Sequence, residues 1–302
     1  MIALRLENIG ALKAQHYEAV KSYVENTMRA GAKANFQNSV LKLSGMEGVT
    51  EADGTDVWLK RFILADVKQL EKWATEEKEK LGFKEMKSLY LNRFSNSPTM
   101  FVDPEKTYNA YTLFRTMGIK VCPYCEDEHI KIVKKEDKDR RTLEFDHFYP
   151  KGDDEYPGLA MCFYNLIPSC KTCNQLKMTS PTAASPYDTD IEWMTWIYPD
   201  LAIGVNMETV SIDECKPLLH ARGGMAVNNS SLALEQRYED QASEVYRLLK
   251  NHQQFPEEKL EEIAQLSGMD KEELRISLFG RPREKARWRE LHTKMKYDLI
   301  GY

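Results

Sequence analysis

The segment LEFDHFYPKG, residues 143–152, places an aspartate and a histidine side by side at the end of an alternating run. Polar and apolar residues alternate over 141–149, which predicts a β-strand, and the following proline and glycine predict its end. Because neighbours on a strand point to opposite faces, Asp146 and His147 face different surroundings. Such a pair can serve acid–base chemistry, metal binding or neither, and its partners elsewhere in the chain decide among these.

Two cysteine pairs, each with a gap of two residues, lie on either side of this segment. The pairs are Cys122 with Cys125 and Cys170 with Cys173. Four thiolates suit Zn²⁺, and a closed shell of four leaves no open position, so we expect a structural zinc ion. A redox motif would need only one pair, on a strand–helix unit, and unrelated buried thiols are the other alternative. The remaining cysteines, Cys162 and Cys215, are predicted to be small buried hydrophobes.

The region between the pairs contains the parts of a hydrolytic site. A second strand is predicted over 163–170, and a short helix begins near residue 173. Hydrolysis of a phosphodiester needs a water, a base and a positive centre that faces the phosphate. His147 is the side chain that is mostly neutral yet basic at cellular pH. Asp146 and Asn174 offer hard oxygen ligands, which suit Mg²⁺.

These elements together resemble the zinc-stapled HNH endonuclease family, whose core is the ββα-metal motif. The resemblance covers residues 122–177. It implies that His147 is the general base, that Asp146 and Asn174 hold Mg²⁺ or Mn²⁺, that Asn165 holds the loop and orients the base, and that Lys177 lies near phosphate. The chain is similar to a His-Asn-Asn variant, because Asn174 stands where the family name has its final histidine.

Two segments are rich in basic residues. Residues 131–151 carry seven Lys or Arg, Lys151 among them, against five acids, and this segment either attracts the DNA backbone or forms a solvated hairpin. Residues 281–296 carry seven Lys or Arg against two Glu. At helical spacing, Arg283 and Arg287 are candidate nucleic-acid contacts. The alternative is a C-terminal helix that buries its tryptophan and solvates its charges.

Length and composition limit the class of protein. The 302 residues suffice for about two domains, and 42% apolar with 29% charged residues is typical of a globular protein. The net charge of −5 neither favours nor excludes nucleic-acid binding. Without an apolar run of about 18–20 residues or a secretion signal, we expect a cytoplasmic protein with no membrane partner.

The predicted fold class is α+β and mainly helical. Hydrophobic periodicity predicts helices over 11–30, from Thr55 to about residue 80, and over 232–251, whereas 191–212 can hold two short strands. We expect a small ββα-metal core with its four-cysteine zinc site embedded between helical regions. The predicted boundaries are 1–118 for the N-terminal region, 119–185 for the core and 186–302 for the C-terminal region.

The functional hypothesis is an HNH endonuclease that hydrolyses DNA, with RNA not excluded. The phrases FDHFYPKG, YNLIPSCKTCN and LFGRPREKARW also resemble the HNH subunits of Septu-type antiviral systems of bacteria and their retron-associated relatives. That resemblance implies a partner ATPase that holds and controls the nuclease. The alternative is a zinc-stabilised nucleic-acid-binding or scaffold module without cleavage. A degenerate module would be expected to lose His147 or Asn174, and both are present.

Overall fold

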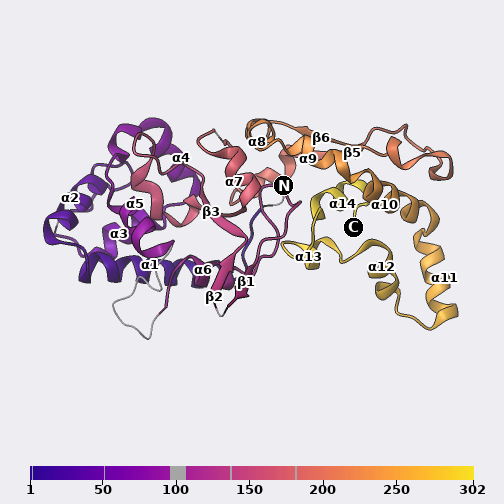
Figure 1. Cartoon of the computed structure of the whole chain (residues 1–302), viewed down its shortest axis with the longest axis horizontal. Helices are drawn as coiled ribbons and strands as arrows, with labels where there is room; N and C mark the ends of the chain where they lie inside the picture. Colours follow the sequence, from indigo (N-terminus) through magenta and orange to yellow (C-terminus); the bar gives the residue numbers. More distant parts are fainter. Residues whose placement is uncertain (2, 51, 96–106, 137, 181) are drawn as a thin grey trace. The chain divides into compact units, whose positions relative to one another are not determined.

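The computed structural model describes all residues except 2, 51, 96–106, 137 and 181. The fold is mainly helical with small two-stranded antiparallel sheets, which confirms the predicted class (Figure 1). Spatial proximity divides the chain into two compact units. Unit 1 comprises Met1–Ala3, Lys120–Ile130 and Gln175–Tyr302, and unit 2 comprises Leu4–Ile119 and Lys131–Asn174. The three-region division predicted from the sequence stays a prediction.

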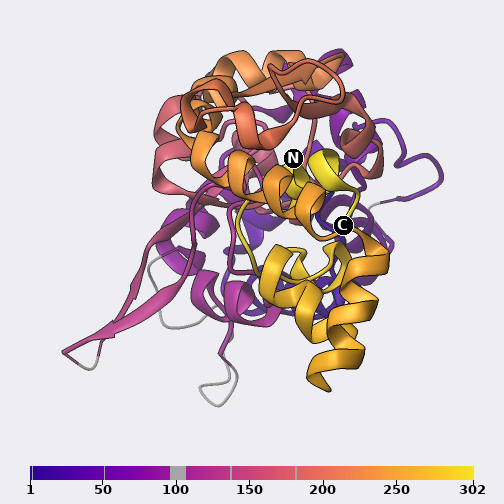
Figure 2. The ribbon, with the colours of Figure 1, turned by 90° about the vertical axis from the view of Figure 1, so that its right-hand side faces the viewer.

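Unit 2 combines helices with two hairpins. Its elements are α1 (Ile9–Asn26), α2 (Ala30–Leu41), α3 (Thr55–Ile63), α4 (Val67–Glu76), α5 (Glu85–Leu89), α6 (Ala110–Met117), β1 (Ile132–Lys135), β2 (Lys138–Arg141), β3 (Leu143–His147) and β4 (Leu166–Cys170), and α7 (Lys171–Lys177) follows β4 directly. The hairpin β1–β2 extends outward from this unit as a two-stranded ribbon (Figure 2).

Two helix predictions in unit 2 were wrong at their ends. The helix expected over 11–30 ends at Asn26, and the one expected from Thr55 is divided into α3 and α4. The Asp66 side chain caps α4 by accepting a hydrogen bond from the Gln69 amide at 2.8 Å. A capping aspartate starts a new helix because it satisfies an amide that has no intrahelical partner. The apolar spacing continues across this break, so periodicity did not reveal it.

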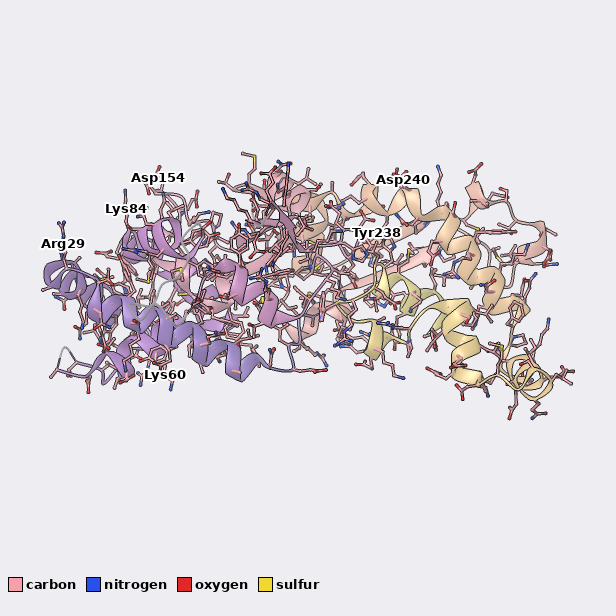
Figure 3. The ribbon with its side chains drawn as sticks, turned by 60° about the horizontal axis from the view of Figure 1, so that its bottom comes forward. Arg29, Lys60, Lys84, Asp154, Tyr238 and Asp240 are labelled. Carbon is pink, nitrogen blue, oxygen red and sulfur yellow. The ribbon has the colours of Figure 1, made fainter. Side chains whose placement is uncertain are left out.

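Aromatic side chains form much of the core of unit 2. The ring centroid of Phe62 lies 5.8 Å from that of Phe36 and 5.5 Å from that of Trp73, and all three side chains are buried. Lys60 and Lys84 are exposed and point outward (Figure 3). This partition of apolar and charged groups is what the hydrophobic effect requires of an amphipathic helical layer.

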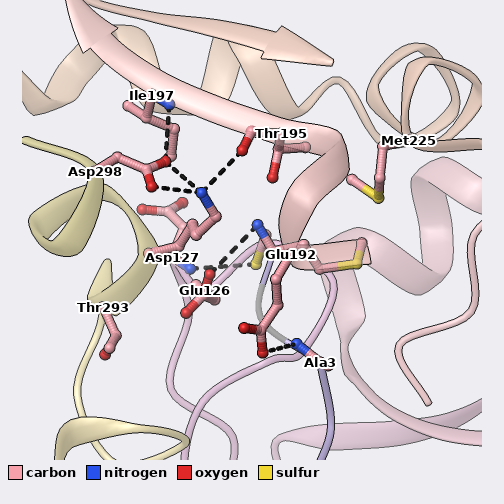
Figure 4. Close-up of polar contacts among 12 residues, drawn as sticks. Ala3, Glu126, Asp127, Glu192, Thr195, Ile197, Met225, Thr293 and Asp298 are labelled. Atoms are coloured by element: carbon pink, nitrogen blue, oxygen red, sulfur yellow. Dashed lines mark hydrogen bonds and ion pairs between the residues drawn. The ribbon is translucent and has the colours of Figure 1, made fainter. Parts of the chain in front are cut away.

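Unit 1 contains one hairpin and a set of helices. Its elements are β5 (Thr195–Pro199), β6 (Pro217–Ala221), α8 (Gly224–Leu232), α9 (Leu234–Tyr238), α10 (Ala242–Gln254), α11 (Glu257–Ser267), α12 (Lys271–Phe279), α13 (Arg283–Ala286) and α14 (Thr293–Ile300). Lys294 and Asp298 of α14 attach that helix to β5. The Lys294 ammonium donates to the Thr195 carbonyl at 2.9 Å, and Asp298 accepts from the Ile197 amide at 2.9 Å (Figure 4).

Three predictions for this part of the chain require correction. The segment 191–212 contains one strand, β5, and not the two strands expected there. The partner of β5 is β6, which lies further along the chain. The helix expected over 232–251 begins only after Ala233, whose φ of 49° is left-handed, and a 3₁₀ turn at Glu239–Gln241 divides it into α9 and α10. The basic segment 281–296 is not one helix, because Trp288 and His292 also have left-handed φ values, 62° and 53°. Left-handed residues cannot continue a right-handed helix, but both lie after Arg287. Arg283 and Arg287 therefore remain one helical turn apart, with the Arg287 amide bonded to the Arg283 carbonyl at 2.9 Å.

Among the described residues, no helix combines the length and apolar character that crossing a bilayer would require.

Candidate metal centre and polar site

The four cysteines of the two pairs lie together in the fold. The sulfur atoms of Cys122, Cys125, Cys170 and Cys173 are buried and all lie within 4.8 Å of one another. Zn–S bonds of about 2.3 Å in a tetrahedron would separate the sulfurs by about 3.8 Å, so the cluster suits a structural zinc ion. All six cysteines of the chain are free thiols. This confirms that the pairs cluster instead of forming disulfides.

Backbone hydrogen bonds shape each cysteine pair. Cys170 Sγ accepts from the Cys173 amide at 3.3 Å, and Cys125 Sγ accepts from the Asp127 amide at 3.4 Å. The Tyr238 hydroxyl donates to the Cys125 carbonyl at 2.9 Å, and burial raises the pKa of that hydroxyl, which therefore stays protonated. Amides aimed at sulfur stabilise thiolate charge, which is the form that binds metal.

The two remaining cysteines have the environment expected for small hydrophobes. Cys162 and Cys215 are fully buried, as predicted. Burial raises the pKa of both thiols, so both stay uncharged near neutral pH.

The strand–loop–strand–helix order predicted around Asp146 and His147 is confirmed. Strands β3 and β4 pair antiparallel, with Asp146 opposite Ile167 and His147 opposite Leu166. Helix α7 begins at the residue after β4. Both side chains of the pair are buried, with 4% of Asp146 and 3% of His147 exposed.

Asn174 is attached to the strand that carries Asp146. Its side-chain Nδ2 donates to a carboxylate oxygen of Glu144. Glu144 precedes Asp146 by two residues on β3, and residues two apart on a strand share a face. Two carboxylates and one amide are thus gathered on one face of the hairpin. No sequence motif points to Glu144, although the alternation along 143–147 places it on this face.

His147 is held by a backbone carbonyl and an aromatic ring. Its Nε2 lies 3.1 Å from the Ala160 oxygen. Because a carbonyl oxygen only accepts, Nε2 carries the hydrogen in the neutral ring, and Nδ1 is the basic nitrogen. The Tyr90 ring meets the imidazole edge to face, with centroids 4.4 Å apart at 77°. Burial raises the pKa of Tyr90 to about 12, and its hydroxyl donates to the Phe145 carbonyl at 3.2 Å.

Three consecutive carbonyls of the loop after β3 each face a buried side-chain nitrogen. The loop contains a short 3₁₀-helix, Pro157–Met161. The pairs are Asn165 Nδ2 with the Leu159 oxygen at 2.9 Å, His147 Nε2 with the Ala160 oxygen at 3.1 Å, and His16 Nε2 with the Met161 oxygen at 2.7 Å. The Leu159 carbonyl also accepts from the Cys162 amide at 3.0 Å, so the Asn165 bond adds to a backbone bond there. The carbonyls at the end of a 3₁₀-helix have no partner within it, and His147 and His16 bond those of Ala160 and Met161.

Asn165 and His16 make further contacts that fix this loop. Asn165 Oδ1 accepts from the Tyr149 amide at 2.7 Å, and its Nδ2 also reaches the Tyr149 carbonyl at 3.2 Å. His16 belongs to α1, and its second ring nitrogen bonds the Tyr108 hydroxyl at 2.7 Å. Burial lowers the pKa of His16 to about 4, so its ring is neutral at neutral pH. No pattern in the sequence pointed to His16 or Tyr90.

The predicted nucleic-acid contacts differ in their exposure. The Lys151 ammonium lies 5.1 Å from the centre of the Tyr90 ring, which itself packs on His147. Lys177 is fully buried, which argues against direct phosphate contact. Arg283 and Arg287 pair with the buried carboxylate of Glu192, and their side chains are 13% and 11% exposed. A phosphate would have to compete with Glu192 for both guanidinium groups.

Comparison with known proteins gives one partial similarity. No protein-family model matches the chain, and no solved structure matches it. A stretch of 70 residues is 38% identical to Septu protein PtuB from Bacillus thuringiensis. That stretch covers 23% of this chain and 24% of the relative, so the match spans about a quarter of the relative's length.

Proposed function

We propose that this chain is a metal-dependent endonuclease of the HNH type that hydrolyses DNA. The observation that carries the proposal is the 3.1 Å contact between Nε2 of His147, which follows Asp146 on β3, and the Ala160 carbonyl oxygen. Because Nε2 is committed to this carbonyl, the basic Nδ1 is the atom that can take a proton. The carboxylates of Glu144 and Asp146 belong to the same short strand.

Asp146 and Asn174 would hold the catalytic ion, Mg²⁺ or Mn²⁺. The donor set fits, because a carboxylate and an amide oxygen are hard ligands. Asn174 gives its Nδ2 to Glu144, which leaves Oδ1 as the atom that can face a cation. When bound, such an ion supplies positive charge opposite the charge that develops on phosphate.

The remaining side chains position the base and the phosphate. His147 accepts the proton of the attacking water, and Tyr90 and Ala160 fix the plane of its ring. Asn165 holds the loop that carries Ala160. Lys151, whose ammonium lies 5.1 Å from the centre of the Tyr90 ring, is the cation that we assign to the substrate phosphate.

The biological setting that we propose is a Septu-type antiviral system. The support is the partial similarity to Septu protein PtuB together with the motif phrases of the sequence. In that setting the chain is the nuclease component, and an ATPase is its partner. The second candidate, a zinc-stabilised binding module without cleavage, is favoured only by the cysteine cluster, which both functions share.

Plasmid cleavage with Mg²⁺ or Mn²⁺ tests the proposal. His147→Ala is expected to lower the cleavage rate about 10²–10⁴-fold, which is the usual contribution of a general base. His220→Ala, an exposed histidine of β6, is the matched control and is expected to cut like the wild type. Zinc content and unfolding temperature would show that both variants fold. Equal cleavage by His147→Ala and wild type, or no cleavage by the wild type even with its native partner, would overturn the proposal.

A further inference from the structure

The β1–β2 hairpin has two faces of different character. In its antiparallel register, Lys134 lies opposite Asp139 and Ile132 opposite Arg141, so these four side chains share one face. This face contacts helix α6. Asp139 forms an ion pair with Arg115 at 2.5 Å, and the Arg141 guanidinium lies 4.8 Å from the centre of the Tyr111 ring.

The opposite face is exposed and positively charged. Val133 lies opposite Arg140, and Lys135 lies opposite Lys138. All four side chains are exposed. Within the described part of the chain, no carboxylate shares this face or pairs with Lys135, Lys138 or Arg140. Glu136 lies in the turn, where its φ is 52°. The strand alternation has thus placed Lys135, Lys138 and Arg140 on the face opposite to Asp139.

The position of the hairpin connects it to the candidate nuclease site. Thr142 joins β2 to β3, and its amide donates to the Lys131 carbonyl at 2.9 Å, which closes the base of the hairpin. From Thr142 to His147 the strand rises by about 17 Å at roughly 3.3 Å per residue. This is about half of the 34 Å turn of B-DNA, so a duplex bound at His147 can reach the hairpin.

The geometry points to the β1–β2 hairpin as a duplex-DNA-binding arm that contacts phosphates through Lys135, Lys138 and Arg140. This assignment rests on the proposed nuclease function. A two-stranded ribbon fits the major groove of B-DNA, whereas the major groove of A-form RNA is too narrow. Single strands are bound mainly by aromatic stacking, and the only apolar group on the outward face is Val133.

Binding of a short DNA duplex tests the assignment. The arm variant is Lys135→Gln, Lys138→Gln and Arg140→Gln in one chain. The control variant, Arg29→Gln, Lys68→Gln and Lys72→Gln, removes three exposed cations from the α2 and α4 region of the same unit, where Arg29 points into solvent (Figure 3). Both are made in the full-length His147→Ala chain, so that cleavage does not consume the duplex. Affinity is measured over a series of salt concentrations and compared with single-stranded DNA and duplex RNA.

The arm variant is expected to bind the DNA duplex more weakly than the control variant. Its slope of log affinity against log salt is expected to fall by about 2.7, because each lost phosphate contact removes about 0.9. Equal affinity and slope in the two variants, an equal loss with single-stranded DNA or duplex RNA, or no duplex binding by the parent chain would overturn the assignment. Arm-dependent binding by a protein that never cleaves would instead count against the nuclease proposal alone.

Discussion

At the scale of single residues, the side chain that we propose as the base, His147, is held by the loop that follows it. The carbonyl that fixes the tautomer of His147 belongs to Ala160, and the carbonyls on either side of it bond Asn165 and His16. A shift of this short 3₁₀-helix would therefore move the imidazole. His16 reaches the loop from α1, so the N-terminal helices contribute to the site although they carry no recognisable motif.

The buried His16 predicts how stability depends on pH. Its pKa is lowered from 6.5 to about 4 by burial, so the folded chain binds fewer protons than the unfolded chain between these values. The contribution of neutral His16 to the free energy of unfolding is complete above pH 6.5 and is lost as the pH falls toward 4. By pH 5.0 the loss is about 2 kcal/mol, at 1.36 kcal/mol per pKa unit.

Urea unfolding of wild type and His16→Gln at pH 7.5 and pH 5.0 measures the pH-dependent contribution of His16 to the free energy of unfolding. The variant lacks the titrating group, so the stability difference between the two proteins is expected to narrow by about 2 kcal/mol at the lower pH. A difference that stays constant across the two pH values would show that His16 is not held neutral in the folded chain.

At the scale of elements, the ββα core was predictable and its supports were not. The two strands and α7 follow one another within 143–177, so local alternation and the cysteine spacing were sufficient. Tyr90 and His16 come from distant helices, and only tertiary packing brings them to the site. Glu144 was partly predictable. Strand alternation places it on the same face as Asp146, but its hydrogen bond with Asn174 is visible only in the structure.

The cysteine cluster predicts a stoichiometric metal. The wild type is expected to contain about one zinc ion per chain, and Cys170→Ser is expected to lose it with a lower unfolding temperature. Cys215→Ser is the control, since Cys215 is buried outside the cluster and bonds the Ser211 carbonyl at 3.6 Å. Metal analysis and thermal unfolding measure both effects. Full retention of tightly bound zinc in Cys170→Ser would contradict a four-thiolate site.

At the scale of the whole molecule, charge patterns in the sequence were a poor guide to binding surfaces. The basic segment 281–296 was the richer of the two in net positive charge, yet Arg283 and Arg287 neutralise the buried Glu192. Residues 131–141 contain six Lys or Arg against three acids, and the hairpin register places Asp139 on the face opposite to Lys135, Lys138 and Arg140. Counting charges along the chain cannot distinguish these cases, because the partner of each charge is set by the fold.

The same observation predicts that cleavage depends on a partner. The chain has a net charge of −5, and two of its candidate phosphate contacts are already paired internally, so its own attraction for DNA is limited. If a Septu-type ATPase holds the substrate, plasmid cleavage by the complex is expected to be at least about tenfold faster than cleavage by the chain alone. A tenfold increase in rate corresponds to lowering the activation free energy by only about 1.4 kcal/mol. The rate of the isolated chain should fall steeply with salt. The complex with His147→Ala separates cleavage by this chain from cleavage by the partner. An isolated chain that cuts as fast as the complex, at every salt concentration, would contradict this dependence.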